Sequence, residues 1–258
     1  MKYFIFLYLT LSVIPVYSQT QFIAHRGASY LAPENTVKSV ELAWDLGSDA
    51  VEIDVQLTVD KRIMVIHDKD TRRTCQGKNF QIASSPSELL RDMDAGTFKD
   101  EKYKGEKIPF LSEITGLTPE GKKLVLNIEC GTEILPDLKR VLKESGKTEQ
   151  IIFTSPYWQT IVAAKDSFPQ NACFWLTSEK HEMQKKLAEV RQAGLDGVSL
   201  SYSLINDKIL AMVKEQKLQL IVRTVNDPRE AGQLIALGID KIMTDRPRWL
   251  KSHLSGIR

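Results

Sequence analysis

The sequence has few cysteines, almost no excess of charge and no glycine-rich phosphate loop. Its three cysteines, Cys75, Cys130 and Cys173, lack the paired C-x-x-C spacing of zinc and redox sites. At 258 residues the chain is also too poor in cysteine for a disulfide framework, so we expect free, buried thiols. The 35 Lys and Arg against 33 Asp and Glu leave a net charge of +2, which does not favour nucleic acid or an anionic membrane as the main partner.

A long apolar run occurs at the N-terminus. One lysine precedes an apolar stretch from Tyr3 to Tyr17, which leads into small residues suited to cleavage after Ser18. This stretch is short for a membrane span, which needs about 20 apolar residues. We therefore predict a signal peptide over residues 1–18 and a mature chain over residues 19–258. The product is expected to be exported, periplasmic or extracellular, with no stable membrane anchor.

The mature chain alternates short apolar runs with stretches of helical periodicity. The runs are continuously apolar, which is typical of strands buried on both faces. Eight such strand and helix pairs in about 240 residues predict an α/β fold, the TIM (β/α)8 barrel, whose active site lies at the C-terminal ends of the strands. A doubly wound open sheet is the alternative, but no phosphate-loop motif supports it. The predicted strands are Phe22–Ala24, Ala50–Leu57, Leu124–Ile128, Ile151–Thr154, Ala172–Leu176, Gly197–Leu200, Leu218–Val222 and Lys241–Thr244. The predicted helices include Thr36–Leu46, Ile134–Ser145, Tyr157–Ser167, Glu182–Ala193, Leu204–Glu215 and Asp227–Leu237.

Residues 68–107 interrupt this alternation. They are rich in charge and contain one short helical stretch, around Pro86–Met93. Because the segment follows a strand end, we predict a small insertion that projects over the active-site face.

The second predicted strand carries two carboxylates on one face. Its period of two places Glu52, Asp54 and Gln56 on one side and three apolar residues on the other. Carboxylates on a buried strand are costly unless they are paired with cations or bind a metal. An ion-pair network with Lys or Arg is the alternative to a metal site.

Residues 58–67 follow as a predicted hairpin with Asp60-Lys61 as a two-residue turn. In this register Asp54 lies opposite His67, and both side chains emerge on the same face. The histidine is therefore expected to meet the carboxylates.

Other polar residues follow the ends of neighbouring strands. His25 and Arg26 follow the first strand, and Glu129 follows the third. Together these positions place two imidazoles, one guanidinium and three carboxylates at one end of the barrel. Oxygen donors without thiolates favour a hard divalent cation, Ca²⁺ or Mg²⁺, and Arg26 favours a phosphate ester as the substrate. We expect Glu34 and Asn35 to fix the first loop and cap the next helix.

The segments that carry these residues resemble the glycerophosphodiester phosphodiesterase family. They are, in order along the chain, AHRGASYLAPENT, DAVEIDVQLTVDKRIMVIHD, DAGTFKDEKYKGEKIPFLSEI, LNIE, RTVN and GIDKIMTDRP. The resemblance extends from about Ile23 to Trp249 and implies a TIM-barrel domain over residues 19–258 with a small insertion at about 68–107. It also implies hydrolysis of a small-molecule phosphodiester to glycerol 3-phosphate and an alcohol.

The resemblance assigns roles to the clustered residues. It implies that Glu52, Asp54 and Glu129 ligate one divalent cation. His25 and His67 would be the catalytic acid/base pair, and Arg26 would hold the phosphate; we expect His25 to act as the base and His67 as the acid. The nucleophile is either water or a neighbouring hydroxyl of the substrate, and the residues leave both open.

Two positions depart from the family pattern. The family usually has Lys where this chain has Gly131, and Trp where it has Arg223. We predict that Arg223 binds the substrate's phosphate or head group in place of the missing lysine; an ion pair with an acidic residue at the rim is the alternative. Other functions remain open: a phosphodiesterase for a different head group or intact phospholipid, or a non-catalytic exported binding protein.

Overall fold

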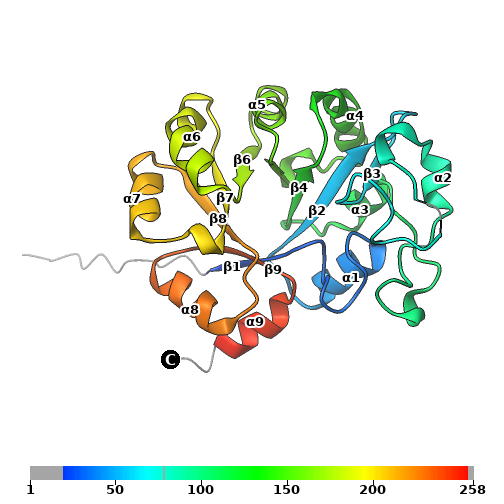
Figure 1. Ribbon diagram of the computed structural model, residues 1–258, viewed down its shortest axis with the longest axis horizontal. Coiled ribbons are helices and arrows are strands. Elements are labelled where there is room, and N and C mark those ends of the chain that lie inside the picture. The colour runs from blue at the N-terminus through cyan, green and yellow to red at the C-terminus, as the bar shows by residue number, and fades with distance from the viewer. Residues whose placement is uncertain (1–19, 78, 255–258) are drawn as a thin grey trace, which may run out of the picture.

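A closed barrel of parallel strands forms the centre of the protein (Figure 1). The computed structural model describes residues 20–77 and 79–254, so the predicted signal peptide lies outside the described residues. The barrel closes because β1 (Gln21–Ala24) pairs with both β2 (Ala50–Leu57) and β9 (Lys241–Thr244). The predicted TIM barrel is confirmed. From β9 back to β2, the remaining barrel strands are β8 (Gln219–Arg223), β7 (Gly197–Ser201), β6 (Ala172–Thr177), β5 (Ile151–Ser155) and β4 (Lys123–Ile128).

Helices connect these strands around the outside of the barrel (Figure 1). α1 begins after Thr36, whose side chain accepts a hydrogen bond from the Ser39 backbone N–H in a capping box. All six stretches named above are helical, and two further helices, α3 and α9, occur at positions that the sequence analysis does not specify. The helices outside the insertion are α1 (Val37–Asp45), α3 (Leu111–Leu117), α4 (Leu135–Ser145), α5 (Trp158–Ser167), α6 (Lys180–Gln192), α7 (Asp207–Glu215), α8 (Pro228–Ala236) and α9 (Pro247–Leu254).

The two faces of β2 have different environments, as its period of two predicts. Val51, Ile53 and Val55 belong to the main core between the strands and the helices. Glu52 and Asp54 lie on the other face, and all eight residues of the strand are buried. A separate apolar cluster on that face forms the floor beneath these carboxylates; it consists of Ile23, Ala50, Val125, Phe174, Ile221 and Met243.

The hairpin after β2 forms, but its predicted register is wrong. The short strand β3 (Ile63–Val65) runs antiparallel to β2, with Val55 opposite Val65. Asp54 is therefore not opposite His67, because the pairing is shifted by one residue.

The shift comes from the turn. The Thr58 backbone N–H donates to the Arg62 carbonyl at 3.0 Å, so three residues, not two, form the loop between them. Lys61, the last of the three, adopts the left-handed conformation with φ 59°. A three-residue loop that ends in a left-handed residue is a common hairpin connection, and it suits Lys better than a two-residue turn that prefers glycine.

The segment after β3 packs around a small apolar cluster of its own. It contains α2 (Ser87–Arg91) and two 3₁₀ turns, at Ile82–Ser84 and Glu101–Tyr103, and lies beside β3 in Figure 1. The cluster comprises Met64, Ile66, Cys75, Ile82, Leu90, Met93, Ala95 and Ile108. The Tyr103 hydroxyl donates to the Leu31 carbonyl at 2.7 Å, so the segment also contacts the loop after β1.

None of the three cysteines forms a disulfide. Cys75 and Cys173 are buried, Cys130 is half-buried, and all three are free thiols, as expected. Within residues 20–77 and 79–254, none of the helices has the length and apolar character needed to cross a membrane.

Candidate active site

A sharp turn after β1 carries His25 and Arg26 to the end of the barrel. Arg26 has φ 55° and Gly27 has φ 78°, both in the left-handed region. A Cβ atom at Gly27 would lie 2.4 Å from the Ser39 Oγ, so only glycine fits there. The turn lets the Arg26 backbone N–H donate to Glu52 Oε2 at 2.8 Å. It therefore places Arg26 directly at the carboxylates of β2.

Two asparagines hold the carboxylates in place. Asn35 Nδ2 donates to Asp54 Oδ2 at 2.8 Å. Asn127 Nδ2 donates both to Asp54 Oδ1 at 2.8 Å and to Glu129 Oε1 at 2.6 Å. Asp54 also lies 3.2 Å from Arg26 Nε. The expectation that Asn35 caps α1 is wrong, because Thr36 caps the helix and Asn35 contacts Asp54.

Glu52, Asp54 and Glu129 form an acidic cluster in which burial and the neighbouring carboxylates favour the protonated form of Glu52 and Glu129. Burial raises the pKa of Glu52 well above its usual value, and the Asp54 charge raises it further. Burial and Asp54 also raise the pKa of Glu129. Asp54, Glu129 and His67 each offer an atom within 4.8 Å of the others, an arrangement that can hold a metal ion. Glu52, the third predicted ligand, is buried on the same strand face as Asp54 but lies outside this close group, in which His67 takes its place.

His25 is held by Asp245, a carboxylate that is not among the predicted site residues. Its Nδ1 lies 2.7 Å from Oδ1 of Asp245, the residue after β9. Asp245 also accepts from Ser29 Oγ at 3.1 Å and from Asn226 Nδ2 at 2.6 Å. Burial alone would raise the pKa of Asp245, but these hydrogen bonds and the His25 charge lower it to about 2. An ionised carboxylate at Nδ1 leaves the Nε2 atom of His25 available for proton transfer.

His67 has the same arrangement. Its Nδ1 lies 2.7 Å from Asp68 Oδ1, and its Nε2 lies 3.9 Å from Glu129 Oε1. Gln56, on the inward face of β2, donates from Nε2 to the His67 carbonyl at 2.9 Å and fixes the backbone there. His67 therefore reaches the carboxylates because it follows the end of β3, despite the shifted register.

Arg223, at the end of β8, faces the cluster with few partners. Among the described residues its guanidinium makes one hydrogen bond, from an Nη atom to Ser178 Oγ at 3.4 Å, and its buried Nε has no partner. Burial lowers the pKa of Arg223, while the charges of Glu52 and Glu129 act in the opposite direction. Within the described ranges, the hydrogen-bond partner of Arg223 is the Ser178 hydroxyl, and no carboxylate lies within ion-pair distance of its guanidinium.

Gly131 lies at the same end of the barrel, after β4. A Cβ atom there would lie 2.3 Å from Glu133 Oε2, the mobile end of a long side chain. The backbone N–H of Gly131 donates to Glu133 Oε1 at 3.2 Å. The position can therefore take a larger side chain if Glu133 turns away.

The structure thus brings the predicted site residues to one end of the barrel. These are His25, Arg26, Glu52, Asp54, His67, Glu129 and Arg223. Sequence reasoning missed the groups that orient them, although two adjoin recognisable signals: Asp68 follows His67 directly, and Asp245 follows a predicted strand. The missed residues are Asp68, Arg73, Asn127 and Asp245. Glu34 and Asn35 were expected only to fix the first loop and cap the next helix, whereas Glu34 binds Arg26 and Arg73 and Asn35 binds Asp54.

Comparisons with known proteins agree on one family. The sequence pattern of the glycerophosphoryl diester phosphodiesterase family matches residues 25–248. A glycerophosphodiester phosphodiesterase of Caldanaerobacter subterraneus is 32% identical over 90% of this chain and 96% of that protein. An Oleispira antarctica phosphodiesterase, solved with the product sn-glycerol-3-phosphate, is 29% identical with a TM-score of 0.85, covering 92% of this chain and 97% of that one. The Parabacteroides distasonis glycerophosphodiester phosphodiesterase shares the fold at 23% identity and a TM-score of 0.74, over 93% of this chain and 98% of the other.

Proposed function

The chain belongs to the glycerophosphoryl diester phosphodiesterase family, and from this premise we propose that it hydrolyses glycerophosphodiesters to glycerol 3-phosphate and an alcohol. It is a phosphodiester hydrolase by family membership. One observation supports the proposed acid/base catalysis by two histidines. Two imidazoles, each held at Nδ1 by a carboxylate 2.7 Å away, lie in the same barrel mouth as an acidic cluster and two guanidiniums. The product bound to the Oleispira antarctica phosphodiesterase supports glycerol 3-phosphate as a product.

The proposed mechanism divides three tasks among these side chains. A phosphodiester is anionic, so the site must neutralise charge, activate a nucleophile and protonate the leaving oxygen. Arg26 and Arg223 supply positive charge to the phosphoryl oxygens. His25 takes the proton of the nucleophile on Nε2, and His67 gives a proton to the leaving oxygen. The Nδ1 hydrogen bonds to Asp245 and Asp68 keep each ring turned so that Nε2 faces the substrate.

The acidic cluster fits a divalent cation. Glu52, Asp54 and Glu129 offer oxygen donors, and their mutual repulsion and burial raise the pKa of Glu52 and Glu129 in the absence of further positive charge. Hard oxygen donors suit Ca²⁺ or Mg²⁺, and we propose one such ion at these carboxylates. When bound, it would supply positive charge to the phosphoryl oxygens.

Product analysis of one substrate panel tests this function. The purified protein is incubated with glycerophosphodiesters of several head groups, with EDTA, and with EDTA followed by excess Mg²⁺ or Ca²⁺. We expect release of glycerol 3-phosphate and the free alcohol, loss of turnover in EDTA, and recovery with one of the ions. Full turnover in EDTA after dialysis would contradict the metal assignment. No turnover of any diester with either ion would favour a binding protein.

The same panel separates the remaining alternatives. Intact phospholipids are included as substrates, because their cleavage would release a diglyceride or a phosphatidic product and identify a lipid phosphodiesterase.

Time-resolved ³¹P NMR distinguishes the two candidate nucleophiles, water and a hydroxyl of the substrate. Attack by a substrate hydroxyl predicts a transient cyclic phosphate, whereas attack by water predicts the open monoester from the first time point.

A further inference from the structure

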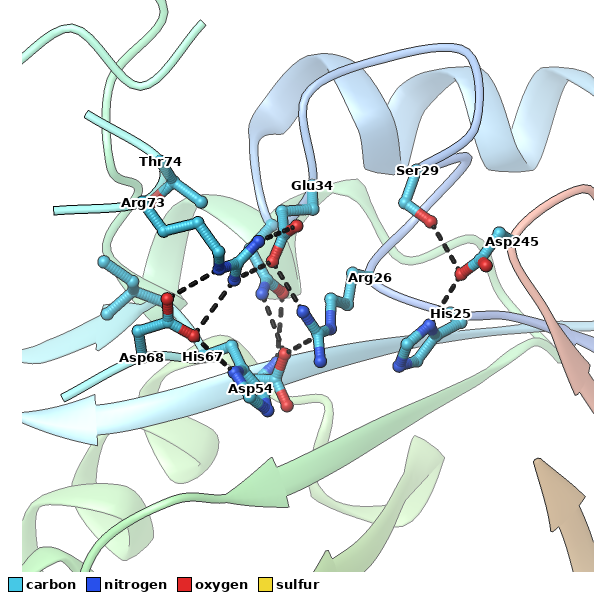
Figure 2. A network of polar contacts seen from close by, with 12 residues as sticks. His25, Arg26, Ser29, Glu34, Asp54, His67, Asp68, Arg73, Thr74 and Asp245 are labelled. Atoms are coloured by element: carbon cyan, nitrogen blue, oxygen red, sulfur yellow. Dashed lines mark hydrogen bonds and ion pairs between the residues drawn. The ribbon is translucent and has the colours of Figure 1, made fainter. Parts of the chain in front are cut away.

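Arg73, in the segment after β3, binds two carboxylates that belong to different loops (Figure 2). Its Nε and one Nη donate to Asp68, at 2.6 Å to Oδ2 and 3.0 Å to Oδ1. Its two Nη atoms donate to Glu34, at 2.7 Å to Oε2 and 2.8 Å to Oε1. Each carboxylate therefore receives a pair of hydrogen bonds from one planar guanidinium.

Both carboxylates have a second partner in the candidate active site. Asp68 Oδ1 lies 2.7 Å from His67 Nδ1. Glu34 Oε1 accepts from an Nη of Arg26 at 2.7 Å. As Figure 2 shows, a continuous series of contacts joins His67 to Arg26 through the Arg73 guanidinium.

We propose that Arg73 is a positioning residue that fixes the orientations of the His67 imidazole and the Arg26 guanidinium together. The inference rests on the proposed function, in which these two groups act on the leaving oxygen and the phosphoryl group. Arg73 itself stays outside the reaction. It connects the segment after β3 to the loop after β1, where Glu34 lies 39 residues away in sequence.

The geometry distinguishes Arg73 from an ordinary surface ion pair. Its side chain is 46% exposed, and an isolated ion pair at such a site contributes little to folding stability. Glu34 and Asp68 are less exposed, at 15% and 26%, and each is shared with a site residue. Losing Arg73 therefore releases two carboxylates that orient the site but removes little packed surface. We expect a small change in stability and a large change in chemistry.

Arg73→Ala, Arg73→Lys and the control Arg72→Ala test the proposal. Arg72 is adjacent in sequence, is 76% exposed and pairs with Asp70. With a diester that has an alkyl leaving group, kcat should fall roughly 10–100-fold in Arg73→Ala and stay within about twofold of wild type in Arg72→Ala. Arg73→Lys should recover only part of the lost kcat. Lysine keeps the positive charge, but its ammonium lacks the planar fork that binds both carboxylates. The Arg73→Ala loss should be smaller with a nitrophenyl leaving group, which needs less protonation.

A spectroscopic readout makes the test independent of turnover. The chain has four histidines, and the Nδ1–H proton resonance of His67 is identified by its absence in His67→Gln. Arg73→Ala should move or broaden this resonance, and Arg72→Ala should leave it unchanged. The proposal is overturned if Arg73→Ala keeps the wild-type resonance, or keeps wild-type kcat in an active enzyme. If the wild-type protein hydrolyses no diester, the proposed function fails and the resonance alone decides the role of Arg73.

Discussion

Among single residues, Arg223 has an unsatisfied donor near the candidate active site. A buried N–H donor normally has a partner, because an unmet donor is costly in a low-dielectric site. Arg223 has a buried, unpartnered Nε, and in the described part of the chain its one hydrogen bond is 3.4 Å long. The Arg26 charge also acts to lower its pKa, so two cations face the same mouth. An anion between them would satisfy both, which supports the proposal that Arg223 binds the substrate phosphate.

Arg223→Ala should lower kcat/KM by roughly 10–100-fold, equivalent to about 1–3 kcal/mol of transition-state stabilisation, because a charged hydrogen-bond donor to phosphate is lost. Adding Gly131→Lys should recover part of the loss, since the new ammonium would enter the same mouth once Glu133 turns away. The matched control is Arg229→Ala, whose side chain is 85% exposed and pairs with Asp227. Steady-state kinetics on one diester check all three variants. A wild-type kcat/KM for Arg223→Ala would exclude the proposed contact.

Among the elements, the segment after β3 contains only short helices, and the carboxylate of Asp94 accepts several hydrogen bonds from its backbone. Asp94 Oδ1 accepts from the backbone N–H groups of Gly96 and Thr97, both at 2.8 Å. Its Oδ2 accepts from the Thr97 hydroxyl and the Gly105 N–H, also at 2.8 Å. Burial alone would raise the pKa of Asp94, but these hydrogen bonds together lower it below its usual 3.8. The Asp94 carboxylate thus joins Gly96 to Gly105, the two ends of a loop whose Tyr103 contacts the loop after β1.

Asp94→Ala should destabilise the protein by about 1–3 kcal/mol, the range for lost hydrogen bonds to a charged group. Because the folded-state pKa lies below the unfolded value, this stabilisation is present above pH 3.8 and is lost as the pH falls below it. The difference in Tm between wild type and variant should therefore be largest near neutral pH and shrink in acid. Asp100→Ala, which removes an exposed carboxylate from the same segment, is the control. Equal melting curves at neutral pH for wild type and Asp94→Ala would refute this role.

At the scale of the whole molecule, the proposed metal ligands lie on two strands, β2 and β4, that are distant in sequence and come together only when they pair in the folded sheet. Glu52 and Asp54 come from β2, and Glu129 follows β4, so the unfolded chain has no preformed site. A ligand that binds only the folded state stabilises it by about 2.7 kcal/mol at 100 times its Kd.

The signal peptide predicted over residues 1–18 supports the further proposal that the activity is exported.

Saturating Mg²⁺ or Ca²⁺ should accordingly raise the Tm of chelator-treated protein by roughly 5–10 °C, from about 2–4 °C per kcal/mol for a chain of this size. Asp54→Asn should lose most of this shift because it removes a ligand charge from the centre of the cluster. Differential scanning calorimetry with and without each ion gives the measurement. An identical Tm in EDTA and in saturating concentrations of both ions would argue against a cation at these carboxylates.

Local sequence patterns predicted the barrel, and they also predicted which polar residues would lie at the C-terminal ends of its strands. Apolar runs and helical periodicity are local properties, and the period of two along β2 requires Glu52 and Asp54 to share a face. Tertiary structure decided the partners: Asp245 reaches His25 because β1 and β9 pair at barrel closure, and Arg73 reaches Glu34 because the segment after β3 contacts the loop after β1. The hairpin register was likewise decided by the left-handed conformation of Lys61, which residue type alone does not predict. Spacing in sequence carries no direct information about contacts between such distant segments, so the residues that orient the site could be identified only in the folded chain.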